Sequence, residues 1–105
     1  MIRLLVPRIL PLGSRRYKVV LKNLRDEGFL GTISHDIEPV VEIDPGPCLT
    51  RRAITFWHEN IHGIKETWHL DMSEADIDRL SEGLNQVLQD GFGIELDWSD
   101  IEVVK

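Results

Sequence analysis

The sequence predicts an α+β fold in which a small sheet packs against two helices. Short β-branched runs separated by turn residues fill the part of the chain before Pro45. Apolar residues then recur at helical spacing from about Leu49, and a second amphipathic run follows Ser73. We therefore expect one domain, residues 1–105, with both helices on one face of an antiparallel sheet of about three strands.

Proline and glycine divide the first half of the chain into candidate strands. Residues 2–10 predict an edge strand or an irregular start, because Pro7 cannot donate a hydrogen bond to a ladder. The sequence PLGS at 11–14 predicts a turn. Three strands are then expected at 17–21, 29–34 and 39–43, separated by a polar turn at 23–28 and a bend at 35–36.

The second half predicts two helices joined by a short connection. Apolar residues lie three or four apart over residues 53–64, and this helix is expected to end between 63 and 67. Ser73 and Asp76 match a capping box, which places the start of the second helix at Ser73. Asp90-Gly91 predicts its end, and the alternating apolar residues of 94–98 predict a final strand.

The composition is that of an ordinary globular protein, with 42% hydrophobic and 29% charged residues. No stretch approaches the ~20 apolar residues of a membrane span, and the MIRLLVPRILPLG start is too interrupted for a signal peptide. We therefore predict a cytoplasmic protein with no membrane partner. Cys48 is the only cysteine, so no intrachain disulfide forms, and we expect it to be buried or half-buried.

Charge is unevenly distributed along a chain whose net charge is −6. Residues 1–25 contain seven Lys or Arg and no acid, whereas the remainder contains all 18 acidic residues. Such a basic segment either binds an acidic partner or nucleic acid, or pairs with the acidic remainder of the same chain. We favour the internal pairing and expect no nucleic-acid partner, because no nucleic-acid-binding motif accompanies the charge.

The run TFWHENIHGI, residues 55–64, contains the pattern HExxH. Residues four apart on a helix share a face, so His58 and His62 can direct imidazole nitrogens at one ion. Glu59 lies about 100° around the helix, within reach of a water held by that ion. The pattern therefore predicts two metal ligands and a general base. The alternative is a coincidental pair of surface histidines, for which this composition gives roughly 0.01 matches per chain.

A catalytic zinc site needs a third protein ligand and an open position. Glu74 is the first choice, because it lies at the rim of the second helix's apolar stripe and the connection 64–72 is short. The alternative explanation is that acidic residues are favoured in any first helical turn. Asp78, four residues further on, is a candidate hydrogen-bond partner for a ligand histidine, and it is also a possible third ligand.

Two other histidines are weaker candidates. His69 is the main rival to Glu74, but the spacing HExxHxxGxxH requires glycine at 65 and histidine at 68, where this chain has Lys65 and Trp68. His35 is expected to be a loop residue, with a role in binding substrate as a minor alternative.

The run HENIHGIKETWHLDMSEADIDRLSEGLNQVLQD resembles small HExxH proteins encoded by phages and prophages. These are similar to minimal zincins of the ImmA/IrrE-like and SprT-like kind, and the resemblance covers about residues 28–90. It implies a three-stranded sheet, an HExxH helix and a second helix that donates an acidic ligand. Carried over residue by residue, it implies His58, His62 and Glu74 as ligands and Glu59 as base.

The chain departs from the family's pattern at two positions. Gly63 replaces the commoner alanine after the second histidine, which is tolerable at a helix end but would loosen it. Ser73 stands at the first position of the family's acidic pair, so only Glu74 remains there as a ligand.

These observations predict a zinc metallopeptidase-like protein of phage or prophage origin that hydrolyses peptide bonds of a protein or peptide substrate in a bacterial cell. One alternative is a catalytically inactive, zinc-stabilised domain that binds a protein partner, since so small a chain has little room for a groove. Another is a metal-free regulator whose basic N-terminal third binds an acidic host protein. The sequence assigns no oligomeric state.

Overall fold

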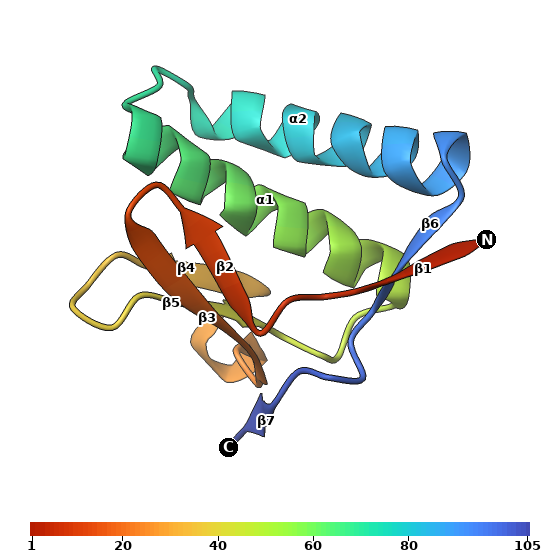
Figure 1. The fold of residues 1–105 in the computed structure, drawn as a ribbon, viewed down its shortest axis with the longest axis horizontal. Helices are drawn as coiled ribbons and strands as arrows, with labels where there is room; N and C mark the ends of the chain where they lie inside the picture. Colours follow the sequence, from red (N-terminus) through yellow and green to blue (C-terminus); the bar gives the residue numbers. More distant parts are fainter.

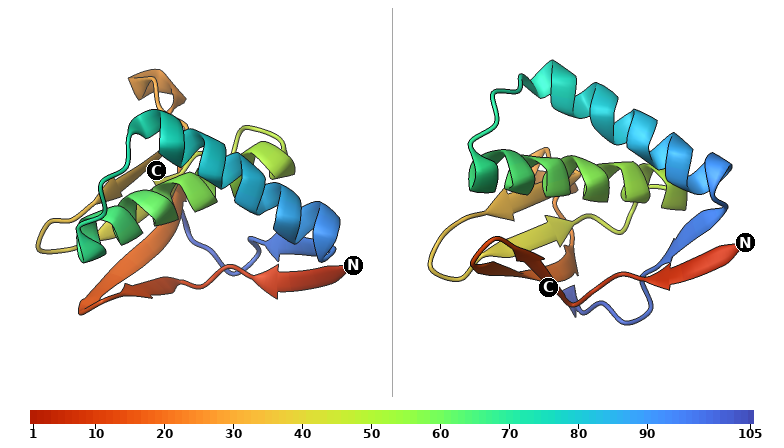
Figure 2. Two further views of the ribbon diagram at one scale, coloured as in Figure 1. Left: turned by 90° about the horizontal axis from the view of Figure 1, so that it is seen from above. Right: turned by 45° about the horizontal axis from the view of Figure 1, so that its top comes forward.

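Two helices lie on one side of a mixed β-sheet in the computed structural model, which describes residues 1–105 (Figure 1). The strands are β1 (Ile2–Leu5), β2 (Ile9–Leu12), β3 (Arg15–Lys22), β4 (Gly31–Ser34), β5 (Val40–Ile43), β6 (Ile94–Asp97) and β7 (Val103–Val104). The helices are α1 (Leu49–Trp68) and α2 (Glu74–Gln86). Figure 2 shows α1 between the sheet and α2. The predicted α+β class is confirmed.

The main sheet has the strand order β2-β3-β5-β4, with β7 also paired to β3. β5 is parallel to β3 and antiparallel to β4, so the predicted antiparallel sheet of about three strands is wrong in strand number and in direction. Burial explains the order. β5 carries Val41 and Ile43, both fully buried, and takes an internal position, whereas the half-exposed sequence GTIS of β4 takes the edge.

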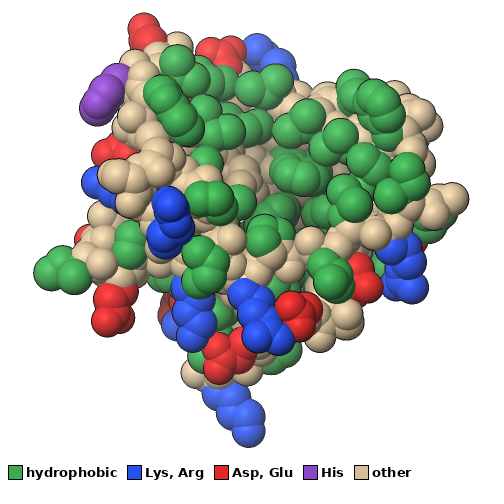
Figure 3. Space-filling model, viewed as in Figure 1, with side chains coloured by type: hydrophobic (Ala, Val, Ile, Leu, Met, Phe, Trp, Pro, Cys, Tyr) green, Lys and Arg blue, Asp and Glu red, His purple; other side chains and the backbone are tan.

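A second, two-stranded sheet joins the two ends of the chain, because β1 pairs in parallel with β6. The predicted irregular run at 2–10 is therefore two strands in different sheets, separated around Pro7. The predicted strand at 94–98 is confirmed as β6. All four side chains of β1 are exposed, and Figure 3 shows apolar side chains spread over this face of the molecule.

The hydrophobic core lies between α1 and the main sheet. Alternate residues of β3 point into it, together with Val41 and Ile43 of β5. Phe56 of α1 covers them and meets the ring of Trp98 edge-on, with the ring centroids 5.3 Å apart. Each such side chain stabilises the fold by about 1.5–3 kcal/mol on burial. This packing fixes the position of α1, and with it the HExxH residues.

α1 extends to Trp68, beyond the predicted end between residues 63 and 67. His69 ends it in the left-handed conformation, with φ 54°. Gly63 is therefore a buried residue inside the helix, and the expectation of a loosened helix end is wrong. A Cβ at Gly63 would lie 2.5 Å from Cδ1 of Leu12 and 3.0 Å from Cδ1 of Ile33. The glycine thus permits α1 to approach β2 and β4 closely.

α2 begins where the capping box predicts. The backbone N–H of Asp76 donates to Oγ of Ser73 at 3.1 Å, and the backbone N–H of Ser73 donates to Oδ2 of Asp76 at 3.2 Å. The hydrogen bonds from Ser73 hold the pKa of Asp76 below its ordinary value. Near the predicted stop, α2 passes into a π-helical turn at Val87–Gly91. The box therefore defines the first turn of α2, which contains Glu74.

Ion pairs join the basic N-terminal segment to acidic residues later in the chain. The four N–O contacts are 2.7–3.5 Å long and link Arg8 to Asp100, Lys18 to Glu102, Lys22 to Glu42 and Arg25 to Asp44. The favoured explanation of the charge distribution, internal pairing, is thus supported for four of the seven basic residues.

Two further sequence predictions concern exposure. Cys48 is exposed at the N-cap of α1, so the expectation of a buried or half-buried thiol is wrong. The helix begins at Leu49, on the surface, and its cap residue stays in contact with solvent. Neither helix combines the length and the apolar character that crossing a membrane requires.

Candidate metal centre

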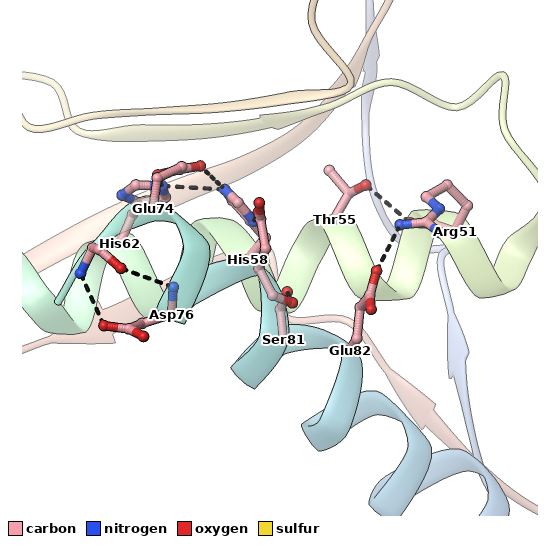
Figure 4. Close-up of polar contacts among 10 residues, drawn as sticks. Arg51, Thr55, His58, His62, Glu74, Asp76, Ser81 and Glu82 are labelled. Atoms are coloured by element: carbon pink, nitrogen blue, oxygen red, sulfur yellow. Dashed lines mark hydrogen bonds and ion pairs between the residues drawn. The ribbon is translucent and has the colours of Figure 1, made fainter.

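Three side chains from the two helices converge at one point (Figure 4). His58 and His62 lie one turn apart on α1, and Glu74 is the first residue of α2. Oε1 of Glu74 lies 2.9 Å from Nε2 of His58, and its Oε2 lies 3.0 Å from Nε2 of His62. The two Nε2 atoms are 3.1 Å apart. The structure therefore brings together the three ligands that the sequence predicts.

The geometry of this cluster fits a divalent metal ion. Ligands about 2.0–2.1 Å from a tetrahedral ion lie roughly 3.3 Å apart. The observed separations of 2.9–3.1 Å, in which each oxygen of Glu74 faces a different histidine, are near that value, and single ligand atoms of the three residues lie within 4.8 Å of one another. The side chain of Glu74 is 61% exposed and is free to make the remaining small adjustment. Two imidazole nitrogens and one carboxylate oxygen suit zinc and neighbouring first-row ions, and they leave a further position open.

Asp78 orients one of the histidines. Its Oδ1 lies 3.0 Å from Nδ1 of His58, on the opposite side of the ring from Glu74. A proton held on Nδ1 by this carboxylate leaves Nε2 unprotonated, which is the form that binds a metal. Asp78 thus occupies the place expected of a hydrogen-bond partner, one turn of α2 beyond Glu74.

Burial also favours the ligand form of the second histidine. Burial of the imidazole lowers the pKa of His62 below its ordinary value, an effect that the nearby carboxylate of Glu74 opposes. A neutral ring at neutral pH keeps a lone pair available to an ion. Both histidines are therefore prepared for coordination, one by a hydrogen bond and the other by desolvation.

Glu59 lies beside this cluster and is 7% exposed. Its carboxylate makes no hydrogen bond and no ion pair within the protein, although the charge of His58 acts on it. Burial raises the pKa of Glu59 to about 7; the charge of His58 opposes that rise and the charge of Glu74 adds to it. A cation bound next to it would lower this pKa again. The carboxylate is thus free to accept a proton from a molecule bound at the cluster.

A cleft of about 400 Å³ opens beside His58 and Glu59. Residues 28–31, which lead into β4, form one wall, α2 forms the other and α1 forms the floor. A Cβ at Gly31 would lie 2.6 Å from Cγ2 of Thr55 and 3.3 Å from Oε2 of Glu59. Only glycine at this position lets β4 lie so close to the Glu59 side chain.

Several residues of the cleft were not expected from the sequence. Arg51 and Thr55 precede Glu59 by eight and four residues, so the helical period alone places them on the face of α1 that carries Glu59. A glycine inside a predicted strand, such as Gly31, is itself a sign of close backbone approach. Glu82 had no such signal, because its position depends on how α2 packs against α1.

The two weaker histidine candidates do not join the centre. His69 is exposed at the end of α1, outside the group of ligand atoms, so the rival three-histidine arrangement is not assembled. His35 follows β4, and its Nδ1 lies 2.7 Å from the hydroxyl oxygen of the buried Tyr17. A separate apolar cavity of about 240 Å³, between α1 and β6, contains none of the candidate ligands.

No family model, curated protein or solved structure matches this chain. The resemblance to minimal zincins therefore stays a prediction that depends on the HExxH-bearing run.

Proposed function

We propose that the protein is a zinc-dependent metallopeptidase that hydrolyses a peptide bond with a metal-activated water. One observation carries the proposal: Glu59, a largely buried acid with no partner within the protein, lines the cleft beside three residues that can each offer a ligand atom within 4.8 Å of the others. A structural metal site has no use for a free buried carboxylate, because an unpaired buried acid is costly. A hydrolytic site needs such a group as its base.

Each residue of the centre has a defined part in this proposal. His58, His62 and Glu74 would hold the ion, which lowers the pKa of water and polarises a carbonyl group. Glu59 accepts the proton of the attacking water and passes it to the leaving amine. Asp78 keeps His58 in the coordinating tautomer through its contact with Nδ1.

The cleft supports a peptide substrate. Its volume of about 400 Å³ is in the range of pockets that bind ligands, and it adjoins both His58 and Glu59. A cleft of this size weighs against the expectation that so small a chain has little room for a groove. Phage or prophage origin and a bacterial cell belong to this proposal through the HExxH resemblance alone, and the cytoplasmic location stays a prediction from the sequence.

Glu59→Gln tests the mechanism. The substitution keeps the size of the side chain and removes the proton acceptor, so we expect cleavage to fall by about 10²–10⁴-fold while bound zinc is retained. Cleavage is measured by mass spectrometry on a mixture of cellular peptides, and zinc by mass spectrometry of the purified protein. Glu66→Gln, an exposed acid on the same helix, is the matched control and should leave cleavage unchanged. Undiminished cleavage by Glu59→Gln would show that the mechanism is wrong.

A second candidate is a zinc-stabilised domain that binds a protein partner without turnover. It is favoured by the ligand arrangement, because Glu74 connects the first turn of α2 to α1, and an ion there would cross-link the two helices. It predicts that Glu59→Gln leaves partner binding intact and that His58→Ala lowers the melting temperature strongly. A metal-free protein that melts at the same temperature as the zinc-loaded protein would exclude it.

A further inference from the structure

We propose that the cleft beside Glu59 binds a basic side chain, lysine or arginine, of a peptide substrate, next to the bond that is cut. This inference rests on the proposed function and names the substrate class of the same site. The observation behind it is the charge of the lining: three carboxylates, Glu59, Asp78 and Glu82, face a single cation, Arg51.

The shape of the cleft suits a long side chain. Its floor runs along α1 from His58 to Arg51, seven residues or about 10 Å at the helical rise. The apolar residues Leu30 and Ile54 also line the cleft. The methylene stem of a lysine or arginine can pack against such a surface while its charged end reaches beyond it.

The far end of the cleft offers a carboxylate that is only loosely engaged (Figure 4). Nη1 of Arg51 lies 3.9 Å from Oε1 of Glu82, at the outer limit of an ion pair, and both side chains are about half exposed. Asp78 is already in contact with His58, and Glu59 lies at the catalytic end. Glu82 is therefore the group available to a cation at the far end.

The opposite preference, for an acidic side chain on Arg51, is disfavoured by the same lining. At the far end of the cleft an acidic side chain would gain one attractive partner, Arg51, and would face the carboxylate of Glu82. Because these groups are partly exposed, the preference should weaken as salt is added.

Peptide binding tests this inference separately from hydrolysis. The probes are three fluorescent peptides that differ only in a central lysine, glutamine or glutamate, and the protein is the full-length Glu59→Gln variant with excess zinc. We expect fluorescence anisotropy to show the lysine peptide bound about tenfold more tightly than the glutamate peptide, with glutamine between. Glu82→Lys should abolish or reverse that order.

Asp90→Lys is the matched control, because it makes the same charge change at an exposed residue outside the cleft. It should leave the lysine preference in place. Equal binding of the three peptides, tighter binding of the glutamate peptide, no binding of any peptide, or a lysine preference that survives Glu82→Lys would each overturn the inference.

Cleavage by the wild-type protein separates the two proposals. If the wild type cuts peptides without regard to charge, the proposed function stands and the basic-substrate inference fails. If the lysine preference is found in binding but no peptide is cut, the preference of the cleft for a basic side chain stands and the hydrolytic function fails.

Discussion

Oδ1 of Asp78 and Nδ1 of His58 lie 3.0 Å apart, while Nε2 of the same ring faces Glu74. Asp78 thus orients the imidazole ring of His58. The other nitrogen of that ring contacts Glu74, which lies one turn earlier on α2. The first two turns of α2 therefore act as a unit on α1.

Metal binding should depend on the three converging side chains. We expect the purified protein to contain about one zinc per chain. His58→Ala and His62→Ala should lose it and Glu74→Ala should weaken it, because each substitution removes one ligand atom of the cluster. Mass spectrometry of the untagged protein measures the content. His69→Ala is the control, since that histidine lies outside the cluster, and loss of zinc there would contradict the assignment.

Asp78→Ala should weaken metal binding without abolishing it. The carboxylate fixes the tautomer of His58, and the loss of such a partner costs about 10–100-fold in metal affinity. Competition with a chromophoric zinc chelator measures the change. Glu82→Ala, on the same helix but without contact to either histidine, should leave zinc affinity unchanged. Equal effects of the two substitutions would mean that general charge, and not the Nδ1 contact, is responsible.

Alanine substitutions at Gly31 and Gly83 should change the free energy of unfolding in opposite directions. Gly31→Ala places a Cβ against Thr55 and Glu59, and overpacking of this kind costs about 1–3 kcal/mol in the free energy of unfolding. Gly83→Ala, in α2, meets nothing within 4 Å and should stabilise the protein by about 0.5–1 kcal/mol through helix propensity. Urea denaturation measures both. A neutral Gly31→Ala would show that β4 does not approach Glu59 so closely.

The buried carboxylate of Asp44 should make the free energy of unfolding fall at acidic pH. Burial acts to raise the pKa of Asp44, but backbone N–H groups of Gly46, Leu24 and Arg25, with the charge of Arg25, outweigh it and hold the pKa below its ordinary value. A lowered native pKa means that stability from Asp44 is complete above the unfolded value of about 3.9 and is lost as pH falls through the native value.

Asp44→Asn isolates this contribution. At neutral pH we expect it to lower the free energy of unfolding by about 1–3 kcal/mol, because a buried charged acceptor of several hydrogen bonds is lost. The difference from wild type should shrink as the pH is lowered below 4 in denaturation experiments. Asp26→Asn, at an exposed residue nearby, is the control. A difference that stays constant down to the acid limit would contradict the lowered pKa.

Local regularities were readable from the sequence because their causes are local. The spacing of His58 and His62 places both on one face of any helix, and the capping box of Ser73 and Asp76 forms wherever a helix begins. The α+β class was predicted correctly from the composition and from the order of strand-like runs followed by apolar residues at helical spacing. The predicted end of α1 was too early because glycine often marks a helix end, whereas Gly63 lies buried inside α1, close to Leu12 and Ile33.

Tertiary packing alone decided the rest. The internal position of β5 depends on burial against α1, which no strand pattern by itself encodes. Three contacts of the site depend on how α2 and β4 pack against α1. They are the approach of Glu74 to the histidines, the closeness of Gly31 to Glu59, and the pairing of Arg51 with Glu82. The sequence by itself determined which chemical groups the chain carries and at what helical spacing. Which of them meet was decided by contacts between residues far apart in the chain, because these form only when the core is buried.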